Sequence, residues 1–241
     1  MATVVLVLLI SFVASLTRST LGFGESLIAV PLLLLFMPAE IAVPLSVMLS
    51  IVIALVIVIQ DHSKVHIQSA KWLILYAIPG IPLGLLLLIY GHTLLVKTIL
   101  GLLIILYALY SLFGKFRLQF ENKGLLFLCG FLSGILGGAY GLNGPPLVVY
   151  GDLKKWSAKH FRATLQAYFL PVSLLGFVGY AIKGLVTTEV THYFLWSLVT
   201  VIPAIFLGRY LNHKLKSQIF FKYVYGGLII VGLVLVLTTW V

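Results

Sequence analysis

The chain has 241 residues, of which 61% are hydrophobic and only 9% charged, and its mean hydropathy is +1.16. A soluble domain carries about 25% charged residues, and a chain of this length cannot hide so much apolar surface in one core. The composition therefore excludes a soluble globular protein. It predicts an all-α polytopic membrane protein that has the lipid bilayer as a partner.

The sequence also argues against cofactor chemistry. The single cysteine, Cys129, excludes a disulfide framework and any site built from cysteine ligands. The six histidines are scattered and form no H-E-x-x-H motif, so we expect neither a metal site nor a cofactor. No G-x-S-x-G motif is present. We expect a protein that is not an enzyme, with an intramembrane enzyme as the weaker alternative.

Charges and clusters of Gly, Pro and Asn divide the chain into ten apolar segments. In chain order, the first half contains a short leg, a glycine-rich tip, a second short leg and three segments long enough to cross a bilayer: 2–17, "RSTLGFGE" (18–25), 26–37, 41–60, 71–91 and 94–113. The second half has the same series: 124–138, "GAYGLNG" (138–144), 145–151, 160–182, 192–211 and 218–240.

Two short legs joined at a polar tip predict a re-entrant helical hairpin, which enters and leaves the membrane on the same face. Irregular backbone at membrane depth is tolerated only where it is buried in protein or lines a cavity. The alternative is a pair of tilted full spans with an ordinary surface turn.

The basic residues predict the orientation. If the first residue is placed on one side and the six long spans alternate, all sixteen Lys and Arg except Arg18, Lys97 and Lys183 reach the opposite side. These thirteen residues lie in the loops 61–71, 114–123, 152–162 and 209–222. The positive-inside rule makes that side cytoplasmic, with both termini external, in the plasma or inner membrane. It also accounts for the net charge of +10 without a nucleic-acid partner.

The order of these landmarks predicts two repeats. A shift of 119 residues places Gly22 on Gly141, and the second long span of each half has an Ile-Pro…Gly pattern, ending at Gly84 and Gly208. Each half holds one hairpin and three full transmembrane helices, an odd number of crossings, so the halves must be inverted. We expect repeats at 1–114 and 124–241 joined by a cytoplasmic linker, 115–123, which is the architecture of secondary transporters.

"GFGESLIAVPLLLL" and, about 120 residues later, "GILGGAYGLNGPPLVVY" resemble the motifs of the TauE/SafE family, membrane proteins named as sulfite and organosulfonate exporters. The resemblance covers essentially the whole chain. It implies transport of sulfite, an organosulfonate or a related sulfur-containing acid out of the cell. The first motif often continues as a glycine run in the family, whereas Glu25 and Ser26 follow here.

The tips carry the candidate site. A helix that begins in mid-membrane presents unpaired N–H groups and the positive end of its dipole, so two such starts can hold an anion. Glycine allows the backbone to approach a ligand closely. We predict that a small anion binds to residues of the two tips and of the span after the second: Arg18, Ser19, Thr20, Gly22, Gly24, Ser26, Tyr140, Gly141, Asn143, Gly144, Gln166 and Tyr168. Helix packing is the alternative role for the glycines and for Gln166 and Tyr168.

Arg18 and Glu25 are the two charges near the first tip. A guanidinium can hold a sulfonate by paired hydrogen bonds, and a carboxyl that alternates between protonation states can couple anion movement to protons. A fixed ion pair between Arg18 and Glu25 is the alternative. The sequence thus predicts a secondary transporter for a small anion, with an uncoupled anion channel as the second reading. It predicts no particular oligomeric state.

Overall fold

Apolar helix-forming segments separated by Gly, Pro and Asn dictate the architecture. A computed structural model describes residues 2–60, 67–113, 123–154, 158–214 and 217–240, and all regular elements within these ranges are α-helices. The first half comprises α1 (Ala2–Leu21), α2 (Glu25–Leu33), α3 (Ala39–Gln60), α4 (Ile67–Ala77), α5 (Gly80–Tyr90) and α6 (Thr93–Phe113). The second half comprises α7 (Lys123–Tyr140), α8 (Gly144–Leu153), α9 (Ala158–Ile182), α10 (Thr188–Lys214) and α11 (Ser217–Trp240).

In the described residues, four helices are long and apolar enough to cross a membrane: Thr3–Leu21, Ala39–Gln60, Thr164–Ile182 and Thr188–Asn212. The last three confirm the spans predicted at 41–60, 160–182 and 192–211. Helices α6 and α11 form at the other predicted positions, 94–113 and 218–240, with shorter apolar stretches among the described residues. Of the predicted basic loops and the linker 115–123, the stretches 61–66, 114–122, 155–157 and 215–216 lie outside the described residues. Most of 152–162 and 209–222 belongs to the ends of α8, α9, α10 and α11.

The remaining predicted span, 71–91, is broken. Its two parts, α4 and α5, meet at an angle of 44° and together count as a fifth candidate span. Pro79 lacks an N–H and its ring crowds the carbonyl one turn earlier, and Gly80 follows it directly. The proline of the second Ile-Pro pattern, Pro203, is followed by Ala204, and α10 continues through it.

The boundaries of the first hairpin also differ from the prediction. The leg 2–17 was expected to be too short to cross a bilayer, but α1 is a continuous helix of 20 residues that includes Arg18. Polar side chains do not break a helix by themselves, since its backbone hydrogen bonds remain intact. The break comes at Gly22 and Gly24, which both have positive φ, 88° and 100°. The second tip likewise begins at Gly141 rather than at Gly138, after α7 has ended at Tyr140.

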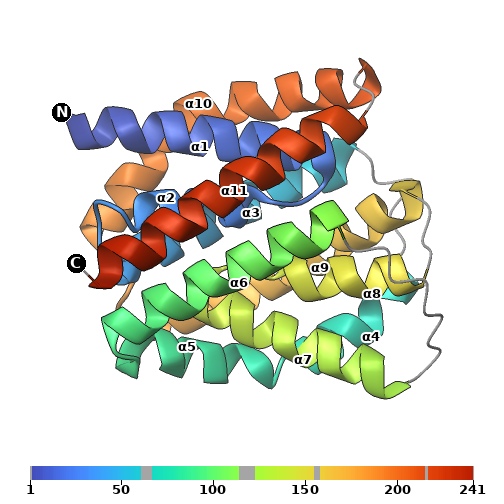
Figure 1. Ribbon diagram of the computed structural model, residues 1–241, viewed down its shortest axis with the longest axis horizontal. Coiled ribbons are helices and arrows are strands. Elements are labelled where there is room, and N and C mark those ends of the chain that lie inside the picture. Colours follow the sequence, from blue (N-terminus) through green and yellow to red (C-terminus); the bar gives the residue numbers. More distant parts are fainter. Residues whose placement is uncertain (1, 61–66, 114–122, 155–157, 215–216, 241) are drawn as a thin grey trace.

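Figure 1 shows the two hairpins running in opposite directions along the molecule. Helix α1 starts at the end where both termini lie and α2 returns toward it, whereas α7 starts at the opposite end and α8 returns there. The ends of α3, α6, α8 and α10 all lie at that opposite end. The tips therefore approach each other in the interior of the molecule.

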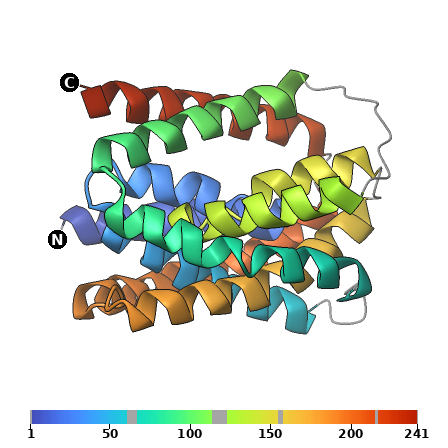
Figure 2. The ribbon, with the colours of Figure 1, turned by 90° about the horizontal axis from the view of Figure 1, so that it is seen from below.

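The main helix contacts join helices of the first half to helices of the second half. Helix α1 packs along α10, α7 packs along α4 and α5, and α3 packs against α9. Helices α6 and α11 pack chiefly on each other, and Figure 2 shows this pair along one side of the molecule. Large apolar side chains are exposed on most helices, for example Leu106, Val199 and Leu237, as expected where lipid replaces water.

Candidate functional site

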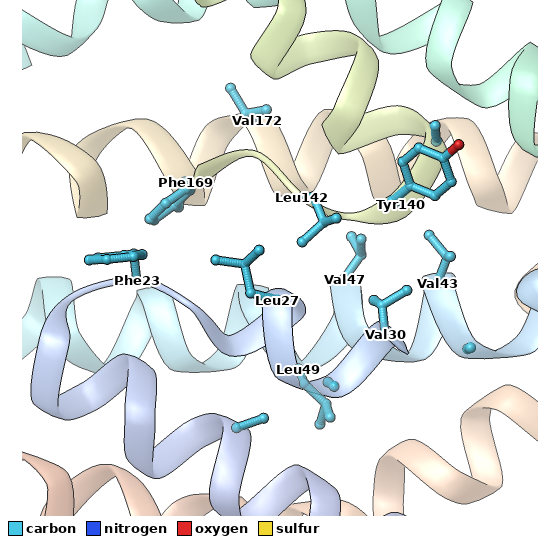
Figure 3. Close-up of a cluster of buried hydrophobic side chains, with 14 of the residues drawn as sticks. Phe23, Leu27, Val30, Val43, Val47, Leu49, Tyr140, Leu142, Phe169 and Val172 are labelled. Carbon is cyan, nitrogen blue, oxygen red and sulfur yellow. The ribbon is translucent and has the colours of Figure 1, made fainter. Parts of the chain in front are cut away.

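Two glycine-rich turns place the starts of α2 and α8 face to face. The first turn contains Gly22 and Gly24, and the second contains Gly141, whose φ is 69°. Positive φ is costly for residues with a Cβ atom, so glycine makes these tight turns possible. In Figure 3 the turn that carries Phe23 lies opposite the turn that carries Leu142.

A buried ion pair lies between the turns. Nη1 of Arg18 lies 3.5 Å from Oε2 of Glu25, and the two side chains are 3% and 1% exposed. Nη1 also donates a hydrogen bond to Oγ of Ser50 on α3. The guanidinium carbon lies 4.7 Å from the centre of the Phe169 ring, which makes a cation–π contact from α9.

Serine hydroxyls satisfy the Glu25 carboxylate. Ser26 donates to Oε2 over 2.9 Å, and Ser46 on α3 donates to Oε1 over 2.8 Å. Each carboxylate oxygen therefore has a neutral partner in addition to the Arg18 charge. Glu25 also occupies the first turn of α2, where the helix dipole favours an anion.

Arg18 is less completely satisfied than Glu25. Its Nε and Nη2 atoms are buried and have no hydrogen-bond partner within the described part of the chain. An unpaired buried donor costs about 1–3 kcal/mol, and more when it is charged. These two N–H groups are a fork of the kind that holds a carboxylate or sulfonate through two parallel hydrogen bonds.

A small cavity of about 20 Å³ lies at this place, enough for about one water molecule. Seven of the predicted site residues line it: Arg18, Gly24, Glu25, Ser26, Gly141, Asn143 and Gly144. Four lining residues were not predicted from the sequence: Leu27, Ser50, Leu142 and Phe169.

Three other predicted residues support the turns. Gln166 on α9 donates to the carbonyl of Gly22 over 2.7 Å. The hydroxyl of Tyr168 lies 2.8 Å from that of Ser133, and Ser133 donates to the carbonyl of Asn143 over 2.5 Å. Helix α9 thereby fixes both turns through hydrogen bonds.

The last three predicted residues lie away from the cavity. Thr20 donates to the carbonyl of Leu16 over 2.7 Å, and Cβ of Ser19 packs where α1 crosses Gly208 of α10. Tyr140 is fully buried, and its hydroxyl has no hydrogen-bond partner among the described residues. Figure 3 places it beside Val43, on the far side of the cluster from Phe23 and Phe169.

One feature of the sequence could have predicted Ser50 as a residue of the site. Ser46 and Ser50 are four residues apart in an otherwise apolar span, so they share one helix face. Polar side chains on one face of a membrane helix mark a surface that is turned away from lipid. Leu27, Leu142 and Phe169 carry no such signal, because apolar residues occur throughout this chain.

The two helix starts differ in what they can donate. The first four N–H groups of a helix have no partner inside it, but two of those positions in α8 are Pro145 and Pro146, which have no N–H. Helix α2 has no proline in its first turn. The donors and the charges of the site therefore come mainly from the first hairpin. Within the described residues, no three His, Cys, Asp or Glu side chains gather in a way that could hold a metal ion.

Apolar helices on the outside, buried charges in the centre and helices that begin inside the molecule define an integral membrane protein with an internal polar site, the general design of transport proteins. The chain belongs to the sulfite exporter TauE/SafE family, whose model matches residues 7–235. No curated protein and no solved structure gave a significant match.

Proposed function

We propose that this protein is a secondary transporter that exports sulfite, an organosulfonate or a related sulfur-containing anion across the cell membrane. Membership of the sulfite exporter family supports the substrate class and the direction. The main support for an anion site is the environment of Arg18. Its guanidinium is buried between the two turns, and its Nε and Nη2 atoms have no hydrogen-bond partner in the described part of the chain. An anion at this position would accept both hydrogen bonds.

Charge balance supports a role for Glu25 in coupling. The Arg18 and Glu25 side chains contribute one positive and one negative charge, 3.5 Å apart, so a bound monoanion would leave a net negative charge in a buried place. Such a charge is costly, and protonation of Glu25 removes it. We propose that a proton binds together with the anion, so that the loaded site stays neutral and the anion and the proton move in the same direction. The concentration gradient of the acid then drives export.

The small volume of the cavity beside Arg18 favours a transporter over a channel. A channel needs a continuous path at the moment of conduction, whereas the space beside Arg18 amounts to about 20 Å³ and is lined by Phe169 and residues of the two turns. Alternating access instead exposes a site near the midplane to one side at a time.

Matching close contacts support two inverted repeats, at 1–114 and 124–241. A Cβ atom built on Gly84 of α5 would lie 2.7 Å from N of Ala139, and one built on Gly208 of α10 would lie 3.2 Å from N of Thr20. Thr20 and Ala139 are 119 residues apart, the same shift that relates Gly22 to Gly141. Each hairpin thus packs its first helix on the Ile-Pro helix of the other half, and the hairpins run in opposite directions (Figure 1).

The orientation that we propose places the basic loops in the cytoplasm and both termini outside. The helix ends that flank the loops lie at one end of the molecule, opposite the termini (Figure 1). In this orientation the first hairpin enters from outside and the second from the cytoplasm.

Transport by purified protein in liposomes tests the function. Liposomes loaded with sulfite should release it faster with the protein than without it, and Arg18→Gln should remove most of the difference. The matched control is Thr20→Val, since Thr20 lies on the same helix and faces α10. Full sulfite release by Arg18→Gln would contradict the proposed role of Arg18. Absence of any protein-dependent release of sulfite or of small sulfonates would contradict the proposed substrates.

A further inference from the structure

A second, larger cavity lies beside the anion site. It is an apolar crevice of about 470 Å³ between α6, α7 and α8. An apolar cavity of about 150 Å³ is enough to bind benzene, so this crevice has room for a chain of several carbons. The walls include Leu106 of α6 and Leu132 of α7, which are 63% and 41% exposed. The crevice is therefore open to the apolar surroundings of the protein.

The crevice and the anion site share two residues. Leu27 of α2 and Leu142 of the second turn line both cavities. Figure 3 shows these side chains facing each other between the two hairpins. Among the described residues, Leu27 and Leu142 are the two that line both cavities, so the Arg18 fork and the apolar space meet at these side chains.

The wall formed by α6 has few contacts with the helices that hold the site. Helix α6 packs chiefly on α11 and touches the rest of the protein mainly through α2. Gly101 and Gly232 bring α6 and α11 close, since a Cβ on either would lie 3.0 Å from the carbonyl oxygen of the other. Lys97 ties α6 to the carbonyl at Leu34, where α2 ends, over 3.1 Å. The crevice thus lies between a separate pair of helices (Figure 2) and the body that holds the site.

We propose that the transported anions include sulfonates with an unbranched apolar tail of several carbons, whose head binds at Arg18 and whose tail passes Leu27 and Leu142 into the crevice. This inference rests on the proposed function, because it takes the Arg18 fork as the anion site. The inference distinguishes the substrates by length. Sulfite needs only the position at Arg18, and the crevice adds affinity for each carbon of a sulfonate tail.

A series of straight-chain sulfonates tests the proposal. Ethane-, butane- and hexanesulfonate would be compared with sulfite as ligands of the purified protein, by calorimetry at a fixed detergent concentration. Burying one methylene contributes about 0.8 kcal/mol, which is about fourfold in affinity. We expect affinity to rise by about that factor for each carbon until the crevice is full.

Two variants locate the tail. Leu132→Trp and Leu106→Trp fill the crevice from opposite walls and should abolish the dependence on chain length while sulfite affinity stays unchanged. The control is Leu175→Trp on α9, since Leu175 is 44% exposed and does not line the crevice. Unchanged sulfite affinity also shows that the variants fold.

Three results would overturn the inference. If sulfite binds but affinity does not rise with tail length, the crevice holds a lipid chain or nothing, and the proposed function stands without the tail. If the rise persists in both tryptophan variants, the tail binds elsewhere, for example in the micelle. If neither sulfite nor any sulfonate binds, the proposed function fails as well.

Discussion

Arg18 has one guanidinium nitrogen committed to Glu25 and Ser50 and two nitrogens without a partner in the described part of the chain. Loss of a hydrogen bond to a charged group costs about 1.5–3 kcal/mol, or roughly 10- to 100-fold in affinity. Arg18→Gln should weaken sulfite binding by that factor. Arg18→Lys should fall between, because an ammonium keeps the charge and loses the paired geometry.

Substitution of Glu25 separates proton coupling from anion binding. Glu25→Gln cannot take up a proton, so the variant should still bind the anion and exchange it across the membrane but should lose its response to a pH gradient. Each anion then carries its charge across, and transport should become sensitive to membrane potential. Glu40→Gln is the control, since Glu40 is exposed at the start of α3. Export by Glu25→Gln that still follows the pH gradient would exclude Glu25 as the proton carrier.

A purely structural ion pair makes a different prediction for the same residues. Each single variant, Arg18→Gln or Glu25→Gln, should then be destabilised, because one buried charge is left without its partner. The double variant should recover both thermal stability and transport. Normal transport by the double variant would exclude both the ligand role of Arg18 and the coupling role of Glu25.

At the scale of the elements, the glycines divide into two kinds that substitution can distinguish. A Cβ on Gly144, at the start of α8, would meet Phe169 and Phe23 at an ordinary 3.9 Å, whereas Gly84 packs against the backbone of α7. Gly144→Ala should therefore keep the melting temperature and reduce transport, because the added methyl enters the small cavity that Gly144 lines. Gly84→Ala should lower the melting temperature, because overpacking costs about 1–3 kcal/mol.

Melting temperature and transport should both be measured for Gly144→Ala and Gly84→Ala. The results decide which glycine lies at the ligand and which serves helix packing. Full transport by Gly144→Ala would show that ligand does not approach this helix start. Gly24 is a poor choice for the same test, because its φ of 100° strains any side chain. Gly208→Ala serves as the companion to Gly84→Ala, and a similar fall in melting temperature is expected from the equivalent contact with α1.

The sequence predicted the helical class, the two turns and seven of the residues around the cavity, because glycine clusters and rare charges are distinctive in so apolar a chain. It misplaced the start of the first turn, because Arg18 looked like a helix break. Inside the protein Arg18 is held by Ser50 and Glu25 from other elements, and such partners are visible only after folding. The bend at Pro79 could not be predicted from the Ile-Pro pattern, because the same pattern leaves α10 unbroken at Pro203.

At the scale of the whole molecule, the distribution of basic residues predicts which end faces the cytoplasm. Single cysteines in a Cys129→Ser background should be labelled by impermeant thiol reagents from the outside of intact cells when placed at Lys183, and only in inside-out vesicles when placed at residue 118. The positive-inside rule is the physical basis. Labelling of residue 118 from outside the cell would reverse the orientation and, with it, the side from which each hairpin enters.

The unequal hairpins have a consequence for how such a protein can evolve. Both charges and the serines that satisfy Glu25 belong to α1, α2 and α3, whereas the second hairpin contributes Leu142, Asn143 and Gly144 to the cavity and begins α8 with two prolines. Mutations in the second turn can reshape the cavity without leaving a buried charge unpaired. If the two halves arose by duplication, as the proposed repeats imply, the first half would preserve the proposed affinity for anions while changes in the second half would alter which anions fit.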